Sequence, residues 1–71
     1  MPLVYAPTNK QLKILRVAAD EKTKKHLESL GIAGGGEIVV LSQSFGSVVC
    51  KIKDGRIALD SNLSAKIFVA A

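Results

Sequence analysis

Two side chains in this 71-residue chain could take part in nucleophilic or metal chemistry, and each is the only residue of its type: His26 and Cys50. Covalent catalysis needs a nucleophile, a base and a third group that orients the base, and stable zinc sites need three or four ligands. Cys50 alternates with Val48 and Ile52, which predicts a small buried hydrophobic side chain. His26 lies in a lysine-rich segment, where we expect an exposed surface group. The sequence therefore predicts neither a catalytic pair nor a metal site.

The acidic residues and the glycines also occupy structural positions. The carboxylates stand where helix starts and turns are expected, and side-chain oxygens at such positions cap backbone N–H groups: Asp20, Glu21, Glu28, Glu37, Asp54 and Asp60. The run Gly34–Gly36 lies between a predicted helix and a predicted strand. A phosphate-binding glycine loop has the opposite order, from a strand into a helix. We therefore expect no catalytic residue and no bound cofactor.

One helix and its end organise the rest of the chain. Asp20 is predicted to cap the start of this helix, and Leu27 and Leu30 are spaced for one helical face. Gly31 suits the left-handed position that follows the last helical residue. In that geometry Ile32 folds back against Leu27, as in a Schellman motif. The helix should therefore end at Gly31.

The remainder of the chain has the alternating pattern of β-strands. About five short strands are predicted, around residues 11–17, 38–41, 48–53, 57–59 and 66–70. The alternation breaks at Ile14–Leu15, which predicts a bulge or burial on both faces. Residues 42–47 are predicted to form a hairpin loop, and Asp54–Gly55 a two-residue type I′ turn. Residues 60–65 are predicted to form one capped helical turn before the last strand.

Length and element order together predict the architecture. A chain of this length forms one domain with a thin core. Residues 1–9, with Leu3–Tyr5 between two prolines, are predicted to form an extended N-terminal arm, and residues 10–71 the folded domain. We predict a mainly β fold, a small SH3-like barrel of about five antiparallel strands with one α-helix inserted after the first strand. A helical turn before the last strand is a common feature of such barrels.

Charge and aromatic residues suggest where a partner could bind. The formal net charge is +4, with the surplus in the predicted strands, which is compatible with a solvated sheet face, nucleic acid, an anionic membrane or an acidic protein. None of the three aromatic residues belongs to a basic strand that also holds aromatic neighbours, so nucleic acid is the less favoured ligand. The remaining candidates for partner binding are the loop that holds Phe45 and the helix face that holds Lys22, Lys25 and His26.

Targeting signals are not evident. The longest apolar run covers residues 67–71, far below the roughly 20 residues that span a bilayer. No basic-then-apolar leader is present, and a single thiol suits a reducing compartment. We therefore expect a cytoplasmic protein that does not insert into the membrane.

The order of these motifs resembles the FeoA family of ferrous iron transport accessory proteins. The similarity is carried by Leu30-Gly31-Ile32, Gly35, the strand 37–41, and the later segments 55–59 and 65–69. It extends from about residue 10 to residue 70 in the same order. One departure is Gly34, which stands where the family favours proline before the turn glycine.

The resemblance implies an SH3-like barrel in the bacterial cytoplasm and a role as a non-enzymatic adaptor. The implied partner is the membrane ferrous iron transporter, which has a cytosolic GTPase domain. No catalytic or metal-binding residue is carried over from the family. A small basic barrel that binds nucleic acid, a domain related to the barrels of iron-dependent repressors, a direct metal sensor and a homo-oligomer remain alternatives.

Overall fold

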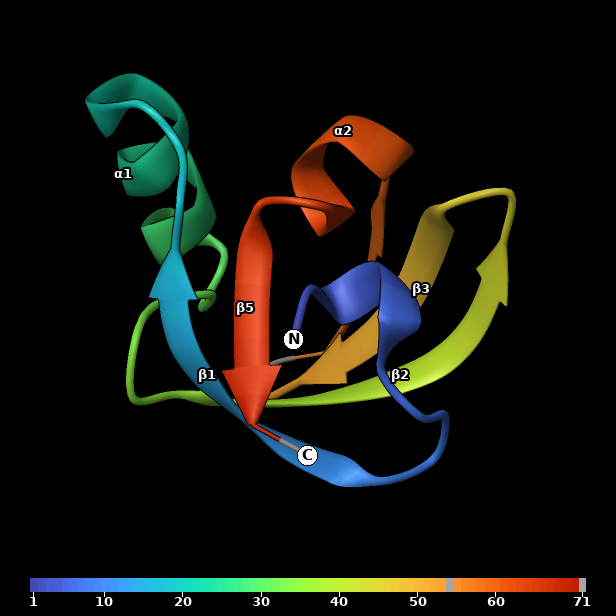
Figure 1. Cartoon of the computed structure of the whole chain (residues 1–71). Coiled ribbons are helices and arrows are strands. Elements are labelled where there is room, and N and C mark those ends of the chain that lie inside the picture. Colours follow the sequence, from blue (N-terminus) through green and yellow to red (C-terminus); the bar gives the residue numbers. More distant parts are fainter. Residues whose placement is uncertain (54, 71) are drawn as a thin grey trace.

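The computed structural model describes residues 1–53 and 55–70 and shows a curved five-stranded antiparallel sheet with two helices and a short 3-10 helix (Figure 1). In chain order the elements are η1 (Leu3–Tyr5), β1 (Gln11–Val17), α1 (Glu21–Ser29), β2 (Glu37–Ser44), β3 (Ser47–Ile52), β4 (Gly55–Leu59), α2 (Ser61–Ser64) and β5 (Ile67–Ala70). The predicted class, mainly β with a helix after the first strand, is confirmed.

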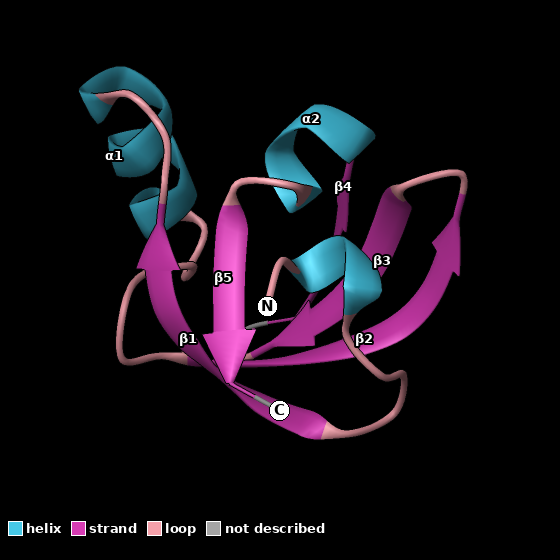
Figure 2. Ribbon diagram, viewed as in Figure 1, coloured by secondary structure: helices cyan, strands magenta, loops and turns pink. Residues whose placement is uncertain are grey.

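The strands are arranged in the order β4-β3-β2-β1-β5, so β4 and β5 are the two edges. Figure 2 shows how the sheet curls so that these edges approach the same side of the molecule. Among the described residues the two edges do not pair, and α2 and η1 fill the opening between them. The sheet is therefore a half-closed barrel.

The core is apolar and draws on every strand. Its buried side chains come from the inward positions of the strands, from η1, and from α1 and the residues after it: Leu3, Leu12, Ile14, Val17, Leu27, Ile32, Ile38, Val40, Val48, Cys50, Leu59, Ile67 and Val69. The pairing register of β1 with β5 shifts between Ile14 and Arg16, which confirms the predicted bulge. Because of this shift Leu15 faces outward, while Val17 returns to the core.

Helix α1 begins and ends where the sequence predicts. The backbone N–H of Thr23 donates to the Asp20 carboxylate at 2.8 Å. Side-chain and backbone hydrogen bonds from Thr23 hold the pKa of Asp20 below its usual value. At the other end, the N–H of Ile32 donates to the Leu27 carbonyl at 2.9 Å, and Gly31 has a φ of +96°. These are the 6→1 hydrogen bond and left-handed residue of a Schellman motif.

The predicted extended arm is wrong for Leu3–Tyr5, which form the 3-10 helix η1. The Leu3 side chain is completely buried, because the turn directs it into the opening between β4 and β5. Pro2 and Ala6, on either side of this helix, are extended. The Val69 N–H donates to the Met1 carbonyl at 2.8 Å, and the Met1 ammonium donates to the Val69 carbonyl at 2.9 Å. The start of the chain thereby covers the outer edge of β5.

Two predicted turns also differ in the structure. The expected loop 42–47 is mostly strand, because Ser44 pairs with Ser47 and only Phe45–Gly46 form the turn. Gly55 is not a central turn residue but the first residue of β4, where it pairs with Ile52. Asp54, the other half of that predicted turn, lies outside the described residues. Residues 42–47 contain no apolar alternation, so their pairing depends on backbone hydrogen bonds that composition does not reveal.

Candidate partner-binding surface

The two potentially reactive side chains, Cys50 and His26, lie in different environments. Cys50 is fully buried, and its thiol lies 3.6 Å from the Ile57 carbonyl oxygen. His26 is exposed on α1. Within residues 1–53 and 55–70 no cluster of three His, Cys, Asp or Glu side chains could hold a metal ion. The structure confirms the predicted roles of a buried small side chain at position 50 and a surface group at position 26.

The buried thiol should give the protein an alkaline limit of stability. Burial raises the pKa of Cys50 from its usual 9.0 to about 11, because the thiolate loses hydration. The folded state therefore holds this proton more tightly than the unfolded chain. The resulting stability is fully present below pH 9.0 and is lost as the pH rises to about 11.

The measurement is urea denaturation of the wild type and Cys50→Ala across this pH range. We expect the difference in free energy of unfolding between the two proteins to shrink between pH 9.0 and about 11. The two proteins share every other side chain, so the difference isolates the thiol. A constant difference across the range would contradict a thiol that resists ionisation.

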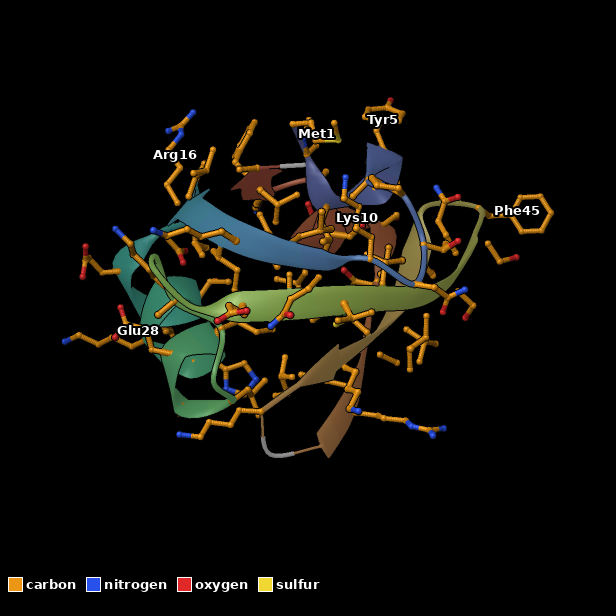
Figure 3. All side chains as sticks on the ribbon, turned by 90° about the horizontal axis from the view of Figure 1, so that it is seen from below. Met1, Tyr5, Lys10, Arg16, Glu28 and Phe45 are labelled. Atoms are coloured by element: carbon orange, nitrogen blue, oxygen red, sulfur yellow. The ribbon has the colours of Figure 1, made fainter. Side chains whose placement is uncertain are left out.

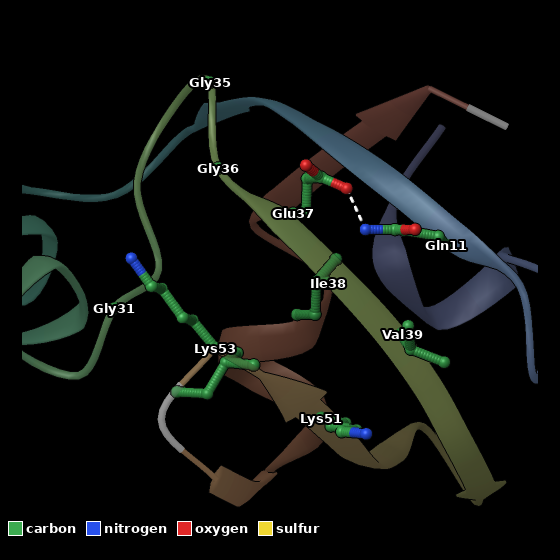
Figure 4. A pocket seen from close by; sticks show the side chains of 10 residues that line it. Gln11, Gly31, Gly35, Gly36, Glu37, Ile38, Val39, Lys51 and Lys53 are labelled. Carbon is green, nitrogen blue, oxygen red and sulfur yellow. Dashed lines mark hydrogen bonds between the residues drawn. The ribbon is translucent and has the colours of Figure 1, made fainter.

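A groove of about 600 Å³ lies beside the glycine corner after α1, formed by Gly31, Gly35 and Gly36, and beside the start of β2 (Figure 4). Lys51 and Lys53 line one side, and the Gln11 amide donates a hydrogen bond to the Glu37 carboxylate on the other. None of the lining side chains is a serine, cysteine or histidine. Among the described residues that line it, the groove therefore offers charge but no Ser–His or Cys–His pair.

The predicted helix face is present in the structure. Lys22, Lys25 and His26 are all exposed on α1, at the i, i+3 and i+4 spacing that places side chains on one face. The opposite face buries Leu27. This face is cationic and solvated, so it can supply long-range attraction to an acidic surface.

Phe45 has the most unusual environment of the predicted site residues. Its side chain is fully exposed, at 102% of the reference value, on the turn between β2 and β3. Its φ is +51° and that of Gly46 is +84°, as a two-residue hairpin turn with two left-handed positions requires. Such a φ costs a non-glycine residue roughly 1–2 kcal/mol, and for a bulky side chain it is rare.

Two hydrogen bonds hold this turn in place. The Ser64 hydroxyl on α2 donates to the Gly46 carbonyl at 2.6 Å, and the Gln43 amide donates to the Val4 carbonyl of η1 at 2.7 Å. The tip of the hairpin is thus fixed to both elements that fill the barrel opening. A fixed tip presents the Phe45 ring in a defined position.

The structure does not bring all four predicted residues together. Figure 3 shows Phe45 projecting from one end of the molecule, while α1, marked by Glu28, lies at the other. Sequence reasoning missed the exposed apolar side chains other than Phe45, of which Tyr5 at 76% and Leu15 at 54% are the most exposed among the described residues. The bulge at residues 14–15 is the signal that could have identified Leu15. There are therefore two separate candidate surfaces, the hairpin tip and the α1 face.

The aromatic ring of Phe68 already contacts a basic side chain. The Arg16 guanidinium lies over the Phe68 ring, 4.6 Å from its centroid, as a cation–π pair across β1 and β5. This ring face is not free for stacking on a nucleic acid base. Among the described residues, moreover, no helix is long and apolar enough to cross a bilayer.

Comparison with solved structures shows the same fold. A crystal structure of an iron uptake regulatory protein (FeoA) superposes with a TM-score of 0.83 and 22% identity, over 97% of this chain and 92% of that one. Iron(II) transport protein A from Clostridium thermocellum gives 0.88 and 23%, over 100% of this chain and 45% of that one. A manganese-dependent transcriptional repressor gives 0.87 and 20%, over 100% of this chain but 41% of that one.

Sequence comparison identifies the family. No curated protein sequence matches this chain significantly. The family model of the FeoA domain, in contrast, matches residues 1–71. The glycine corner after α1, the five antiparallel strands and the capped turn before β5 occur here in the order predicted for that family. With the whole length matched, the chain belongs to the FeoA domain family.

Proposed function

We propose that this chain is a non-enzymatic adaptor of ferrous iron uptake that acts in the cytoplasm. It docks onto a membrane iron transporter with a cytosolic GTPase domain and changes the assembly or nucleotide turnover of that transporter. Family membership supports this proposal, as does the name of a structurally similar protein, iron(II) transport protein A. The exposed Phe45 ring and the exposed cationic side chains of α1 offer surfaces for contact, which agrees with an adaptor role.

The single observation that carries the docking role is the conformation of Phe45. A fully exposed aromatic ring gains nothing from the core, and its left-handed backbone costs stability. Asparagine or glycine would suit this turn position better. An exposed ring at such a position is available for contact with another protein, and aromatic side chains buried on binding are frequent hot spots of protein interfaces.

The bracing of the turn supports the same role. Because Ser64 and Gln43 already fix the hairpin, little conformational entropy is lost when the ring enters a pocket on a partner. The α1 face with Lys22, Lys25 and His26, at the other end of the molecule, adds electrostatic attraction to an acidic surface. In this proposal Phe45 supplies affinity, while the lysines increase the rate of encounter.

The test is co-purification with the full-length transporter in detergent, with and without guanine nucleotide, using Phe45→Asn. We expect this variant to bind at least about tenfold more weakly, which corresponds to about 1.4 kcal/mol. At the same time its thermal stability should increase, since asparagine accepts the left-handed turn more readily. Phe45→Tyr is the matched control, which keeps the ring and the backbone strain and should bind like the wild type.

The possible outcomes test the adaptor function and the role of Phe45 separately. If the wild type does not co-purify with the transporter in either nucleotide state, the adaptor function is wrong. If the wild type binds and Phe45→Asn binds equally well, the adaptor function stands and the hairpin tip is not its contact.

A further inference from the structure

The two edges of the sheet differ in how they are covered. The outer edge of β5 carries Met1, through hydrogen bonds of 2.8 and 2.9 Å to Val69, and Pro2 bridges to Phe68. The outer edge of β4 has no backbone partner within the described part of the chain. A Cβ placed on Gly55, at the start of β4, would meet no atom within 4 Å. In Figure 2, β4 lies at the rim of the sheet behind α2. Among the described residues, the β5 edge therefore has a backbone partner and the β4 edge has none, although α2 contacts β4.

The register shows which backbone groups are free at the outer edge of β4. Ile52 and Gly55 close a two-residue hairpin, and such a closing pair exchanges both of its backbone hydrogen bonds. Bonded pairs alternate along an antiparallel ladder, so Ile57 and Leu59 also bond to β3. The N–H and C=O groups of Arg56 and Ala58 therefore face away from the sheet. Their spacing of two residues is the repeat that an added strand needs.

The side chains beside this edge are cationic. Lys51 lies directly opposite Arg56, on the outward face, and Lys53 follows two residues later in sequence. Residues 51–56 contain these three cations and one acidic residue, Asp54. Like charges directly opposite one another destabilise a sheet. Carboxylates added on this face would relieve that repulsion.

The same charges select between possible occupants. A second copy of β4 would bring another Arg56 to the edge, and charged side chains on an edge strand oppose such self-pairing. An added strand from another protein would place alternate residues next to Arg56 on the outward face and next to half-buried Ile57 on the inward face. Acidic residues suit the first position and apolar residues the second.

We propose that the outer edge of β4 binds an extended segment of a partner protein in which acidic and apolar residues alternate. The segment pairs with the free backbone groups of Arg56 and Ala58, and its acidic side chains lie beside Lys51 and Arg56. This inference concerns a surface distinct from Phe45 and does not depend on the identity of the partner. It holds or fails separately from the transporter adaptor role.

The test titrates the isotopically labelled full chain with a blocked peptide of about eight residues in which glutamate and valine alternate. We expect a dissociation constant below about 1 mM at low salt, a weakening of at least about threefold at high salt, and the largest amide shifts in β4. The same peptide with lysine in place of glutamate is the matched control and should not bind.

Two variants examine the backbone and the charge separately. Ala58→Pro removes an outward N–H that β3 does not use, so the fold should persist while peptide binding is lost. Arg56→Glu keeps the backbone but leaves two cations and two acidic residues in 51–56, so the preference for the glutamate peptide over the lysine peptide should be lost. If Ala58→Pro does not fold, Arg56→Glu still tests the proposal.

Several results would overturn the proposal. Equal binding of both peptides to the wild type, shifts centred on β5 or Phe45, or binding by Ala58→Pro at wild-type strength would each exclude a strand added to β4. Salt-sensitive binding of single-stranded DNA to β3 and β4 that Ala58→Pro leaves unchanged, without glutamate-peptide binding, would assign the cationic edge to nucleic acid instead.

Discussion

Replacement of Leu27 by alanine is expected to lower the free energy of unfolding by about 2–5 kcal/mol. Leu27 is the only fully buried side chain of α1, and its carbonyl also accepts the Schellman hydrogen bond from Ile32. The substitution removes the apolar contact by which α1 packs on the barrel and leaves a cavity. A domain of this length has a total stability of only roughly 4–10 kcal/mol. Much of the variant should therefore be unfolded well below the melting temperature of the wild type.

The matched control is Leu15→Ala, which removes the same atoms from a side chain that is 54% exposed. We expect this control to change stability by no more than about 0.5 kcal/mol. Urea denaturation followed by far-ultraviolet circular dichroism provides both values. Equal destabilisation by the two substitutions would show that α1 does not depend on the Leu27 contact.

Replacement of Gly46 by alanine is expected to cost about 2–4 kcal/mol, from two causes that act together. The backbone φ of +84° disfavours any side chain. In addition, the new Cβ would lie 2.9 Å from the Ser61 Cβ of α2, which is too close for two carbon atoms. The hairpin and α2 must then separate, and the 2.6 Å hydrogen bond from Ser64 to the Gly46 carbonyl would weaken.

Gly35→Ala separates the two causes. Gly35 has a similar φ of +89°, but a Cβ at that position meets no atom within 4 Å. This control should therefore lose only the left-handed backbone term of about 1–2 kcal/mol. Thermal unfolding of both variants measures the difference. If Gly46→Ala is no less stable than Gly35→Ala, α2 does not pack against the hairpin as described.

The sequence predicts those features that depend on neighbouring residues. The cap at Asp20, the Schellman end at Gly31 and the capped turn after Asp60 are closed by hydrogen bonds between residues three to five positions apart. The inward faces of the strands follow from alternation, which Val48 and Cys50 show clearly. The exposure of Phe45 was also predictable, because a turn tip has few neighbours to bury it.

The hairpin turns and the N-terminal segment were less accessible to sequence reasoning. The segment 42–47 lacks alternating apolar residues, so its strand pairing and its two-residue turn were missed. The sequence predicts an extended arm at Leu3, because nothing local indicates that this side chain occupies the opening between two distant strands. These features depend on contacts between residues far apart in the sequence.

The sequence by itself thus determined the family and the order of elements, since each depends on residue type and local spacing. The tertiary structure alone decided that Phe45 and the α1 face point from opposite ends of the molecule. It also decided that Met1 covers the edge of β5, while the edge of β4 has no backbone partner in residues 1–53 and 55–70. Both outcomes follow from how the sheet curls and which strands become its edges, and curvature and edge order arise from long-range packing that no local pattern encodes.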